Sequence, residues 1–255
     1  MVSLSTAKTA AILLIGDELL SAKVQDQNGA LLIVALRQMG VELTEIVVLP
    51  DRVDRIVEAV QRVTSRNDCV FSSGGIGPTH DDKTMLAMGQ AFGETLERRA
   101  ELVDIINTYH HDGGSAGWMK MAEVPTSCEL LYHEGTRWPC FKVHNVFVLP
   151  GIPQIFGRQF EFLKGHLECL SPFVVRTLYH RRHEGVVAPI LSAADEKFAA
   201  VSFGSYPVWG RDDYEVRITI ESRDPAAVDA ATQWLLEHFE HDDVFEARAG
   251  SAQPS

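Results

Sequence analysis

Positive charge is scarce in this sequence of 255 residues. Lysine and arginine together number 23, against 35 aspartates and glutamates, and the formal net charge is −12. Proteins that bind nucleic acid gain much of their affinity from cations that meet phosphates. The acidic balance therefore excludes non-specific nucleic-acid binding as the main task, and we expect no nucleic-acid partner.

Long apolar runs are missing as well. No run approaches the roughly 20 residues that a membrane-spanning helix needs, and residues 1–9 lack a charged segment followed by an apolar core, so we expect no secretory signal. The cysteines, at 69, 128, 140 and 169, form no CxxC pair, which leaves structural zinc and a disulfide framework without support. We expect buried free thiols, a cytoplasmic location and no membrane partner.

Three common catalytic patterns are also absent. The chain has no Walker-type lysine loop, no GxGxxG after its first apolar run and no Ser-His-Asp order. What it has instead is the stretch 72–84, SSGGIGPTHDDKT, between the apolar run Cys69–Phe71 and the apolar residues from Met85 onward. We interpret this stretch as the crossing from a buried strand to a helix.

Residues 10–71 alternate between apolar runs of strand length and segments with apolar residues at helical spacing. The expected strands are Ala10–Ile15, Val41–Leu49 and Asp68–Phe71, and the expected helices are Asn28–Gly40 and Val53–Val63. This alternation predicts an α/β fold with a mostly parallel sheet covered on both faces. Ligands of such sheets bind beyond the carboxyl ends of the strands. Gly16-Asp17, Pro50-Asp51 and the loop Gly74–Asp82 all fall at such ends.

The later part of the chain has a different pattern. A helix is expected at Ala100–Tyr109, then an irregular stretch at His110–Gly117 that could act as a lid. Antiparallel strands at Cys128–Tyr132 and Phe141–Leu149 and a helix at Gln154–Leu167 follow. After a break in composition at Cys169–Pro172 comes a small α+β domain with an antiparallel sheet, whose expected elements are Phe173–Tyr179, Gly185–Phe198, Ala200–Phe203, Tyr214–Glu221 and Ala226–Phe239. We predict a first domain over residues 1–168, a second over 169–247 and a flexible tail over 248–255.

The loop after the third strand combines glycines with carboxylates. Gly74, Gly75 and Gly77 allow backbone N–H groups to approach a phosphate closely, and the following helix adds a favourable dipole. Asp81 and Asp82 would repel a bare phosphate but suit one that arrives with a divalent metal. The combination suggests a nucleotide or phosphorylated cofactor handled together with a metal.

Each of these polar residues also has a purely structural interpretation. Thr79–Asp82 reads as a capping box, with Thr79 at the N-cap. Asp51 can cap the next helix, and Asp17 with Glu18 can form a solvated turn. Asp26 and Asn28 can cap, and Ser72, Ser73 and Thr79 can satisfy local backbone groups. His80 beside Asp81 carries little specificity as a metal ligand.

Three aromatic residues also allow more than one interpretation. Trp118 is either a stacking surface or a plug over the core. Tyr206 and Trp209, within Gly204–Gly210, suit ring stacking, an oligomer contact or a satellite apolar cluster.

Five segments in order resemble the molybdopterin-binding (MoaB/MogA/CinA-like) domain over about the first two thirds of the chain. They are GDELL at 16–20, QDQN at 25–28, PD at 50–51, GGIGPTHDD at 74–82 and LPGIP at 149–153. Residues 184–221 resemble the segment that follows this domain in eukaryotic FAD synthases, so the likeness extends over nearly the whole chain. Ala22 and Gln27 depart from the usual glycine and threonine, which affects the fine geometry of that loop.

The resemblance implies a three-layer α/β/α MogA-like domain followed by a small α+β domain, and a protein that self-associates. It implies that Asp51 and Asp82 are catalytic. We expect these two residues, with Asp17 as a third carboxylate, to hold a divalent Mg, Mn or Co ion. We assign phosphate or nucleotide contacts to Gly16, Asn28, Ser73, Gly74, Gly75, Gly77 and Thr79.

Three functions remain open. The first, which we expect, is metal-dependent hydrolysis of a nucleotide pyrophosphate such as FAD or ADP-ribose, with FAD as the preferred substrate. The second is a module that binds molybdopterin or a nucleotide without turnover, and the third is a MogA-like molybdopterin adenylyltransferase.

Overall fold

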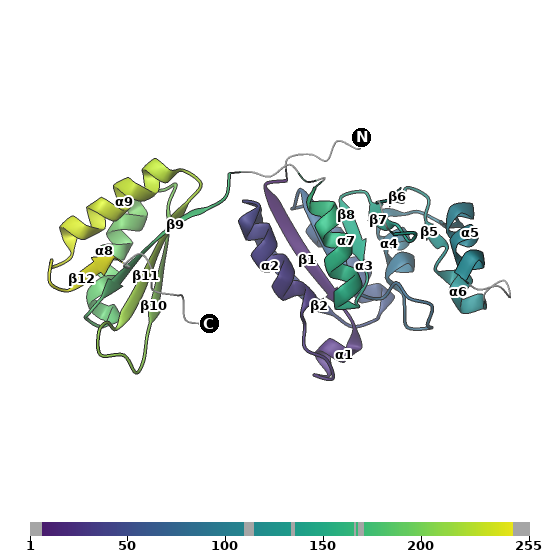
Figure 1. Cartoon of the computed structure of the whole chain (residues 1–255), viewed down its shortest axis with the longest axis horizontal. Helices are drawn as coiled ribbons and strands as arrows, with labels where there is room; N and C mark the ends of the chain where they lie inside the picture. The colour runs from purple at the N-terminus through teal and green to yellow at the C-terminus, as the bar shows by residue number, and fades with distance from the viewer. Residues whose placement is uncertain (1–6, 110–114, 134–135, 166, 168–170, 247–255) are drawn as a thin grey trace. The chain divides into compact units, whose positions relative to one another are not determined.

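The computed structural model describes residues 7–109, 115–133, 136–165, 167 and 171–246 (Figure 1). Its contacts separate the chain into two compact units, Met1–Leu170 and Ser171–Ser255, which are described one after the other. In the part of the chain that the model describes, no helix is long and apolar enough to cross a bilayer. The proposed tail and Cys169 lie outside the described residues.

The first unit is built on a mixed sheet in the order β2-β1-β3-β8-β7-β6. Its strands are β1 (Thr9–Ile15), β2 (Glu42–Leu49), β3 (Cys69–Ser73), β6 (Glu129–Leu131), β7 (Cys140–Val143) and β8 (Val146–Leu149). Strands β2, β1, β3 and β8 run parallel, while β7 is antiparallel to both β8 and β6. Central strand β1 is buried at every position after Thr9, because helices cover both faces. The predicted mostly parallel α/β sheet is confirmed.

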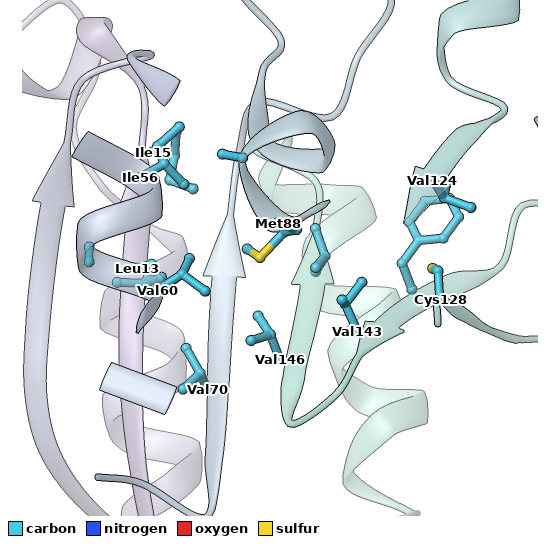
Figure 2. Close-up of a cluster of buried hydrophobic side chains, with 14 of the residues drawn as sticks. Leu13, Ile15, Ile56, Val60, Val70, Met88, Val124, Cys128, Val143 and Val146 are labelled. Atoms are coloured by element: carbon cyan, nitrogen blue, oxygen red, sulfur yellow. The ribbon is translucent and has the colours of Figure 1, made fainter. Parts of the chain in front are cut away.

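Each face of the sheet has its own apolar core. Ile12, Leu14 and Phe71 pack with helices α2 (Asn28–Gln38) and α7 (Pro153–Lys164). Leu13, Ile15 and Val70 pack on the other face with α3 (Val53–Thr64), α4 (Thr84–Phe92) and α5 (Ala100–Tyr109). Figure 2 shows part of this second cluster, in which side chains of β1 and β3 meet those of α3 and α4. Alternate residues of β1 thus serve opposite cores, as strand geometry requires.

Several elements of the first unit differ from the sequence-based expectation. Gly16-Asp17-Glu18 was expected to be a loop, but Asp17–Leu20 forms the short helix α1. The expected strand Phe141–Leu149 is instead the hairpin β7–β8, because His144 adopts a left-handed φ of 53° and turns the chain. Strands β4 (Leu96–Arg98) and β5 (Glu123–Pro125) were not predicted, and they form a separate antiparallel pair.

The expected lid at His110–Gly117 is only partly described. Residues 110–114 lie outside the described residues, and Ala116–Lys120 forms the helix α6. Trp118 therefore lies on a helix rather than in a loop, with 37% of its surface exposed.

The cysteines that the model describes are buried free thiols. Cys69, Cys128 and Cys140 form no disulfide and are nearly inaccessible. Burial raises the pKa of each of these thiols to about 12. The prediction of buried free thiols is confirmed for these three residues.

The second unit is an antiparallel sheet in the order β10-β11-β9-β12. Its elements are β9 (Val174–His180), α8 (Glu184–Lys197), β10 (Ser202–Pro207), β11 (Val216–Ser222), α9 (Pro225–His238) and β12 (Val244–Glu246). Leu178, Ile218 and Ile220 pack against both helices, which lie together on one face of the sheet (Figure 1). This confirms the α+β prediction.

Two boundaries of the second unit were misjudged. Strand β10 continues through Pro207, where a turn was expected from Gly204, because Gly204 to Pro207 pair in register with β11. Strand β12 was missed altogether. The predicted cap of the last helix is confirmed, since Asp224 Oδ1 accepts a hydrogen bond from the N–H of Ala226 at 2.9 Å.

Candidate functional site

The carboxyl ends of the parallel strands meet at one edge of the first unit's sheet. The N–H of Gly16, after β1, donates to the carbonyl of Leu49 at the end of β2, at 3.0 Å. The N–H of Gly74, after β3, donates to the carbonyl of Leu149 at the end of β8, at 3.1 Å. The first bond joins the Gly16-Asp17 and Pro50-Asp51 loops, and the pairing of β1 with β3 places the glycine-rich loop beside them. The two bonds also engage the N–H groups of Gly16 and Gly74, so these two groups do not point to a phosphate as predicted.

The loop after β3 requires glycine at two positions. Gly74 has φ of 105° and Gly75 has φ of 66°, a region that other residues rarely adopt. A Cβ at Gly74 would lie 2.1 Å from the carbonyl oxygen of Ile15, and one at Gly75 would lie 2.3 Å from Thr84 Oγ1. Thr84 fixes the loop, because its hydroxyl donates to the carbonyl of Gly74 at 2.9 Å.

Consecutive N–H groups of this loop remain free for a ligand. Among the described residues, the N–H groups of Gly75, Ile76 and Gly77 have no protein acceptor. Successive unpaired N–H groups in a tight loop form a concave anion-binding surface. The N–H groups of Gly75 and Gly77 are thus available for the phosphate contact that the sequence predicts.

Asp51 lies among other carboxylates at the end of β2. Its Oδ2 accepts a hydrogen bond from the N–H of Asp17 at 2.9 Å. Burial raises the pKa of Asp51, and the negative charges of Asp17, Glu18 and Asp81 raise it further, although the bond from the Asp17 N–H acts in the opposite direction. The side chain of Lys83 donates to the Asp51 carbonyl at 3.1 Å rather than to its carboxylate. Among the residues that the structure describes, no cationic side chain pairs with the Asp51 carboxylate.

Asp82 is the second carboxylate, after Asp51, that was predicted to be catalytic at this edge of the sheet. Its Oδ2 accepts bonds from the N–H and the hydroxyl of Thr79, the former at 2.8 Å. The bond from the Thr79 N–H to the Asp82 carboxylate is one of the two bonds of the expected capping box. Thr79 is not the N-cap, however, because α4 begins only at Thr84, after Lys83. A Cβ at Gly77 would lie 2.7 Å from Asp82 Oδ2, so the carboxylate packs against the glycine loop.

The expected three-carboxylate metal site is not assembled by side chains alone. Across residues 7–109, 115–133, 136–165, 167 and 171–246, no three His, Cys, Asp or Glu side chains are grouped closely enough to hold an ion. Local hydrogen bonds hold the two carboxylates apart from one another: Asp51 Oδ2 accepts from the N–H of Asp17, and Asp82 Oδ2 accepts from the N–H of Thr79. The second oxygen of Asp51 and of Asp82 accepts no hydrogen bond from the described residues. His80 has a side chain 97% exposed and is no part of such a group.

Asn28 and Ser73 act inside the protein. Asn28 Nδ2 donates to Ser73 Oγ at 2.8 Å and to the carbonyl of Gly151 at 2.9 Å, and both side chains are buried. Ser73 Oγ lies 3.4 Å from the carbonyl of Pro150 as a donor. This network joins the start of α2 to the end of β3 and to the β8–α7 turn. Asn28 and Ser73 therefore support the loops, and the Asn28 amide hydrogens are not available to a phosphate.

A hollow of about 170 Å³ opens beside the glycine loop and Asp82. It is lined by Gly75, Ile76, Gly77, Asp82, Met85, Leu86, Leu96, Lys120, Met121, Glu123 and Phe141. Sequence reasoning missed Lys120, because it lies between the irregular stretch His110–Gly117 and the strand expected at Cys128–Tyr132 and has no motif around it. Its proximity to Asp82 comes from tertiary packing alone.

Comparison with known families gives two matches that together span most of the chain. Residues 11–168 match the model of a probable molybdopterin binding domain. Residues 172–248 match the model of the FAD synthase middle domain.

Individual relatives agree with these matches. A probable FAD synthase of Caenorhabditis elegans is 30% identical over 90% of this chain and 50% of its own length. A protein of Thermococcus kodakarensis is 31% identical over 83% of this chain and 94% of its own length. The crystal structure of CinA from Thermoplasma acidophilum, described as of unknown function, superposes with a TM-score of 0.58 at 26% identity, covering 63% of this chain and 98% of that one. The chain spans about half the length of the nematode relative.

Proposed function

Because this chain belongs to the probable molybdopterin-binding domain family, with a FAD synthase middle domain after it, we propose that it hydrolyses the pyrophosphate of a nucleotide such as FAD or ADP-ribose. The observation that carries the proposal is the juxtaposition at the sheet edge of the free N–H groups of Gly75 and Gly77 with the carboxylates of Asp51 and Asp82. An anion-binding loop next to carboxylates suits a phosphate that brings its own cation.

The proposed divalent ion would bind at this site only together with the substrate, whose phosphate oxygens would complete its coordination. Mg²⁺ is commonly held by one or two carboxylates together with phosphate oxygens and water. Asp51 Oδ1 and Asp82 Oδ1 would serve as the protein ligands, because the partner oxygens of both are already engaged. Asp17 would contribute its charge and its N–H rather than a third ligand. A bound ion would supply neutralisation of phosphate charge and a lower pKa for water.

The chain's own residues would then position the reaction. The N–H groups of Gly75 and Gly77 would hold one phosphate and stabilise the charge that builds on its oxygens. Water would attack one phosphorus, the bond from that phosphorus to the bridging oxygen would break, and two monophosphates would leave. The proton that the water releases would pass to solvent. The products would be AMP with FMN or with ribose 5-phosphate.

FAD is the preferred substrate within this class. The match of residues 172–248 to the FAD synthase middle domain, and the likeness to a nematode probable FAD synthase over 90% of this chain, support this choice over molybdopterin adenylylation. A MogA-like adenylyltransferase would use the same aspartates, so the site itself separates the two activities poorly.

A second candidate is a binding module without turnover. It is favoured by one observation: Asp51 and Asp82 each accept a structural hydrogen bond, from Asp17 and Thr79 respectively, and so have a role in loop geometry without any metal. Such a module would bind a nucleotide or molybdopterin on the same glycine loop.

A product assay separates these candidates. Purified protein is incubated with FAD, ADP-ribose or ATP, each with magnesium, manganese, cobalt or no metal, and products are separated by chromatography. We expect AMP and FMN from FAD only when a metal is present, and none from the Asp82→Asn variant. The matched control is Asp81→Asn, which removes the neighbouring charge from a carboxylate that is 58% exposed. No product from any substrate, together with nucleotide binding by calorimetry, would reject the hydrolase and favour the module.

A further inference from the structure

Helix α6 is fastened to the loop that carries Asp82. The ammonium group of Lys120, the last residue of α6, donates to the carbonyls of Thr79 and Asp82 at 2.6 and 2.5 Å. These two carbonyls lie three residues apart on the strand-to-helix crossing. One side chain thus joins two segments that are about 40 residues apart in sequence.

A second contact holds the other end of α6 against the same loop. A Cβ placed on Gly117 would lie 2.8 Å from the carbonyl oxygen of Pro78. The helix backbone therefore approaches the loop so closely that only glycine fits there. With Gly117 at Pro78 and Lys120 at Thr79 and Asp82, the short helix is positioned along the whole loop.

The fastened helix forms one wall of the hollow beside the glycine loop. Lys120 and the following Met121 line it from this side, while Ile76, Met85 and Phe141 line it from the glycine loop, α4 and β7. Most of the lining is apolar, and Lys120 is its single cation among the described residues. A hollow with an apolar lining next to free N–H groups has the character expected for a nucleotide, with the ring in the apolar part and the phosphate on the loop.

The size of the hollow restricts the ring that enters. An engineered apolar cavity of about 150 Å³ holds a benzene molecule, and this hollow measures about 170 Å³. It therefore suits a small aromatic base more than the three fused rings of a flavin. Its width depends on where α6 lies, and α6 is positioned through Lys120.

We propose that Lys120 is a positioning residue, whose bonds to Thr79 and Asp82 hold α6 in place and thereby shape the hollow for the base of a nucleotide. The inference rests on the proposed function, because it uses the glycine loop as the phosphate site. In this role Lys120 acts through α6 and does not touch the phosphate.

The test compares two probes that share a phosphorylated ribose but differ in the ring. AMP and ribose 5-phosphate are titrated by calorimetry into the wild-type chain, Lys120→Met and Lys120→Arg. We expect wild type to bind AMP more tightly than ribose 5-phosphate. Lys120→Met should weaken AMP about tenfold, the effect of leaving α6 in its binding position in only about one molecule in ten, and leave ribose 5-phosphate unchanged. Lys120→Arg, which keeps two donors, should recover most of the AMP affinity.

Three results would overturn the role. Equal weakening of both probes would mean that Lys120 contacts the phosphate. Unchanged AMP affinity in Lys120→Met would mean that the bonds to Thr79 and Asp82 do not shape the hollow. Wild-type binding of AMP no tighter than of ribose 5-phosphate, or of neither probe, would mean that no base enters. Lys164→Met is the control for loss of a lysine, because Lys164 pairs with Glu161 on α7, away from the hollow.

Hydrogen exchange gives a readout without any ligand. Amides of residues 116–121 should exchange faster in Lys120→Met than in wild type, while those of β1 and β3 should not change. Unchanged exchange in α6 would contradict the fastening role, as would a uniform increase across the unit. If AMP and exchange behave as expected but FAD is never hydrolysed, the proposed hydrolase fails and the role of Lys120 stands. If FAD is hydrolysed but the AMP affinity is unchanged in Lys120→Met, the proposed hydrolase stands and the role of Lys120 fails.

Discussion

The carboxylate of Asp51 accepts a hydrogen bond from the backbone N–H of Asp17 at 2.9 Å, and this contact joins the end of β2 to the start of α1. Two acidic residues thus meet through one backbone donor rather than through a cation. The pKa of Asp51 is raised by burial and by the neighbouring carboxylates, so folding favours its protonated form. At neutral pH the charge of Asp51 costs stability, and this cost disappears as the pH falls below its raised pKa.

Replacing Asp51 by asparagine should separate stability from activity. The amide oxygen can still accept from the Asp17 N–H, and the unfavourable charge is gone, so the free energy of unfolding at pH 7 should stay equal or rise. Turnover of FAD should fall at least about 10- to 100-fold, because a neutral amide oxygen holds a divalent ion less firmly than a carboxylate. Urea denaturation and the product assay check the two effects. Asp54→Asn, at an exposed carboxylate paired with Arg52, is the control. A variant with full activity would remove Asp51 from the mechanism.

Gly74 and Gly93 offer a matched pair for the glycine loop. Both have positive φ, at 105° and 71°, but an added Cβ meets the Ile15 carbonyl at 2.1 Å in one case and nothing within 4 Å in the other. Gly93→Ala should cost only the strain of the left-handed backbone, about 1 to 2 kcal/mol. Gly74→Ala should cost about 1 to 3 kcal/mol more, from overpacking. Equal costs by urea denaturation would show that the loop yields more easily than its close contact suggests.

Asn28 should prove to be a structural residue. Asn28→Ala removes both donors to Ser73 and Gly151 and leaves buried acceptors unpaired, so the free energy of unfolding should fall by about 1 to 3 kcal/mol. Ser73→Ala and the double variant complete a cycle, in which the shared hydrogen bond appears as a coupling of about 0.5 kcal/mol or more. Additive effects would indicate that the two side chains stabilise the loops independently.

Glu94 should make the first unit sensitive to acid. Burial alone would raise its pKa, but donors from Ser127, His144 and Thr126 outweigh burial and lower the pKa from 4.5 to about 2. A lowered pKa contributes stability above pH 4.5 that is lost as the pH falls from there towards 2. Glu94→Gln should therefore unfold more easily than wild type at pH 7, and the difference should shrink in this window.

The acid effect has a simple control. Glu161→Gln changes an exposed glutamate on α7 and should shift thermal unfolding little at any pH. If wild type and Glu94→Gln differ by the same amount at pH 7 and at pH 3, ionisation of Glu94 does not contribute, and only the packing of its side chain does.

Metal binding should require the nucleotide. Because no three ligating side chains are grouped in the part of the chain that the model describes, manganese alone should bind weakly, and a chelator should leave the thermal midpoint of the ligand-free chain unchanged. Calorimetric titration of manganese with and without AMP checks this dependence. Tight binding of manganese to the ligand-free chain would show that the carboxylates rearrange into a complete site.

The sequence was informative where the physics is local. Apolar runs such as Ala10–Ile15 became β1 because a strand between two helical layers must be apolar on both faces. The glycines at 74 and 75 and the cap at Asp224 follow from backbone geometry, and each lies where expected. The order of strand ends then brings Gly74, Asp51 and Asp17 to one edge without further information.

Features that depend on distant partners could not be predicted. The turn at His144 contains no glycine or proline, so Phe141–Leu149 looked like one strand. The N–H groups of Gly16 and Gly74 were assigned to phosphate, but neighbouring strands engage them. Whether Asp17 would present its carboxylate or its N–H to Asp51 was decided by the turn into α1. The meeting of Lys120 with Thr79 likewise depends on how β4, β5 and α6 pack.

The buried thiols can report local opening of the first unit. All four cysteines of the sequence precede residue 171, so the second unit carries none. Cys69 and Cys140 belong to the core on the α2 and α7 side of the sheet, and Cys128 to the core on the other side. A thiol with a pKa of about 12 and no solvent access reacts with an alkylating reagent only when its surroundings open. The alkylation rates of Cys69, Cys128 and Cys140 therefore report the opening of the two layers of the first unit, while the second unit has no thiol to react with the reagent.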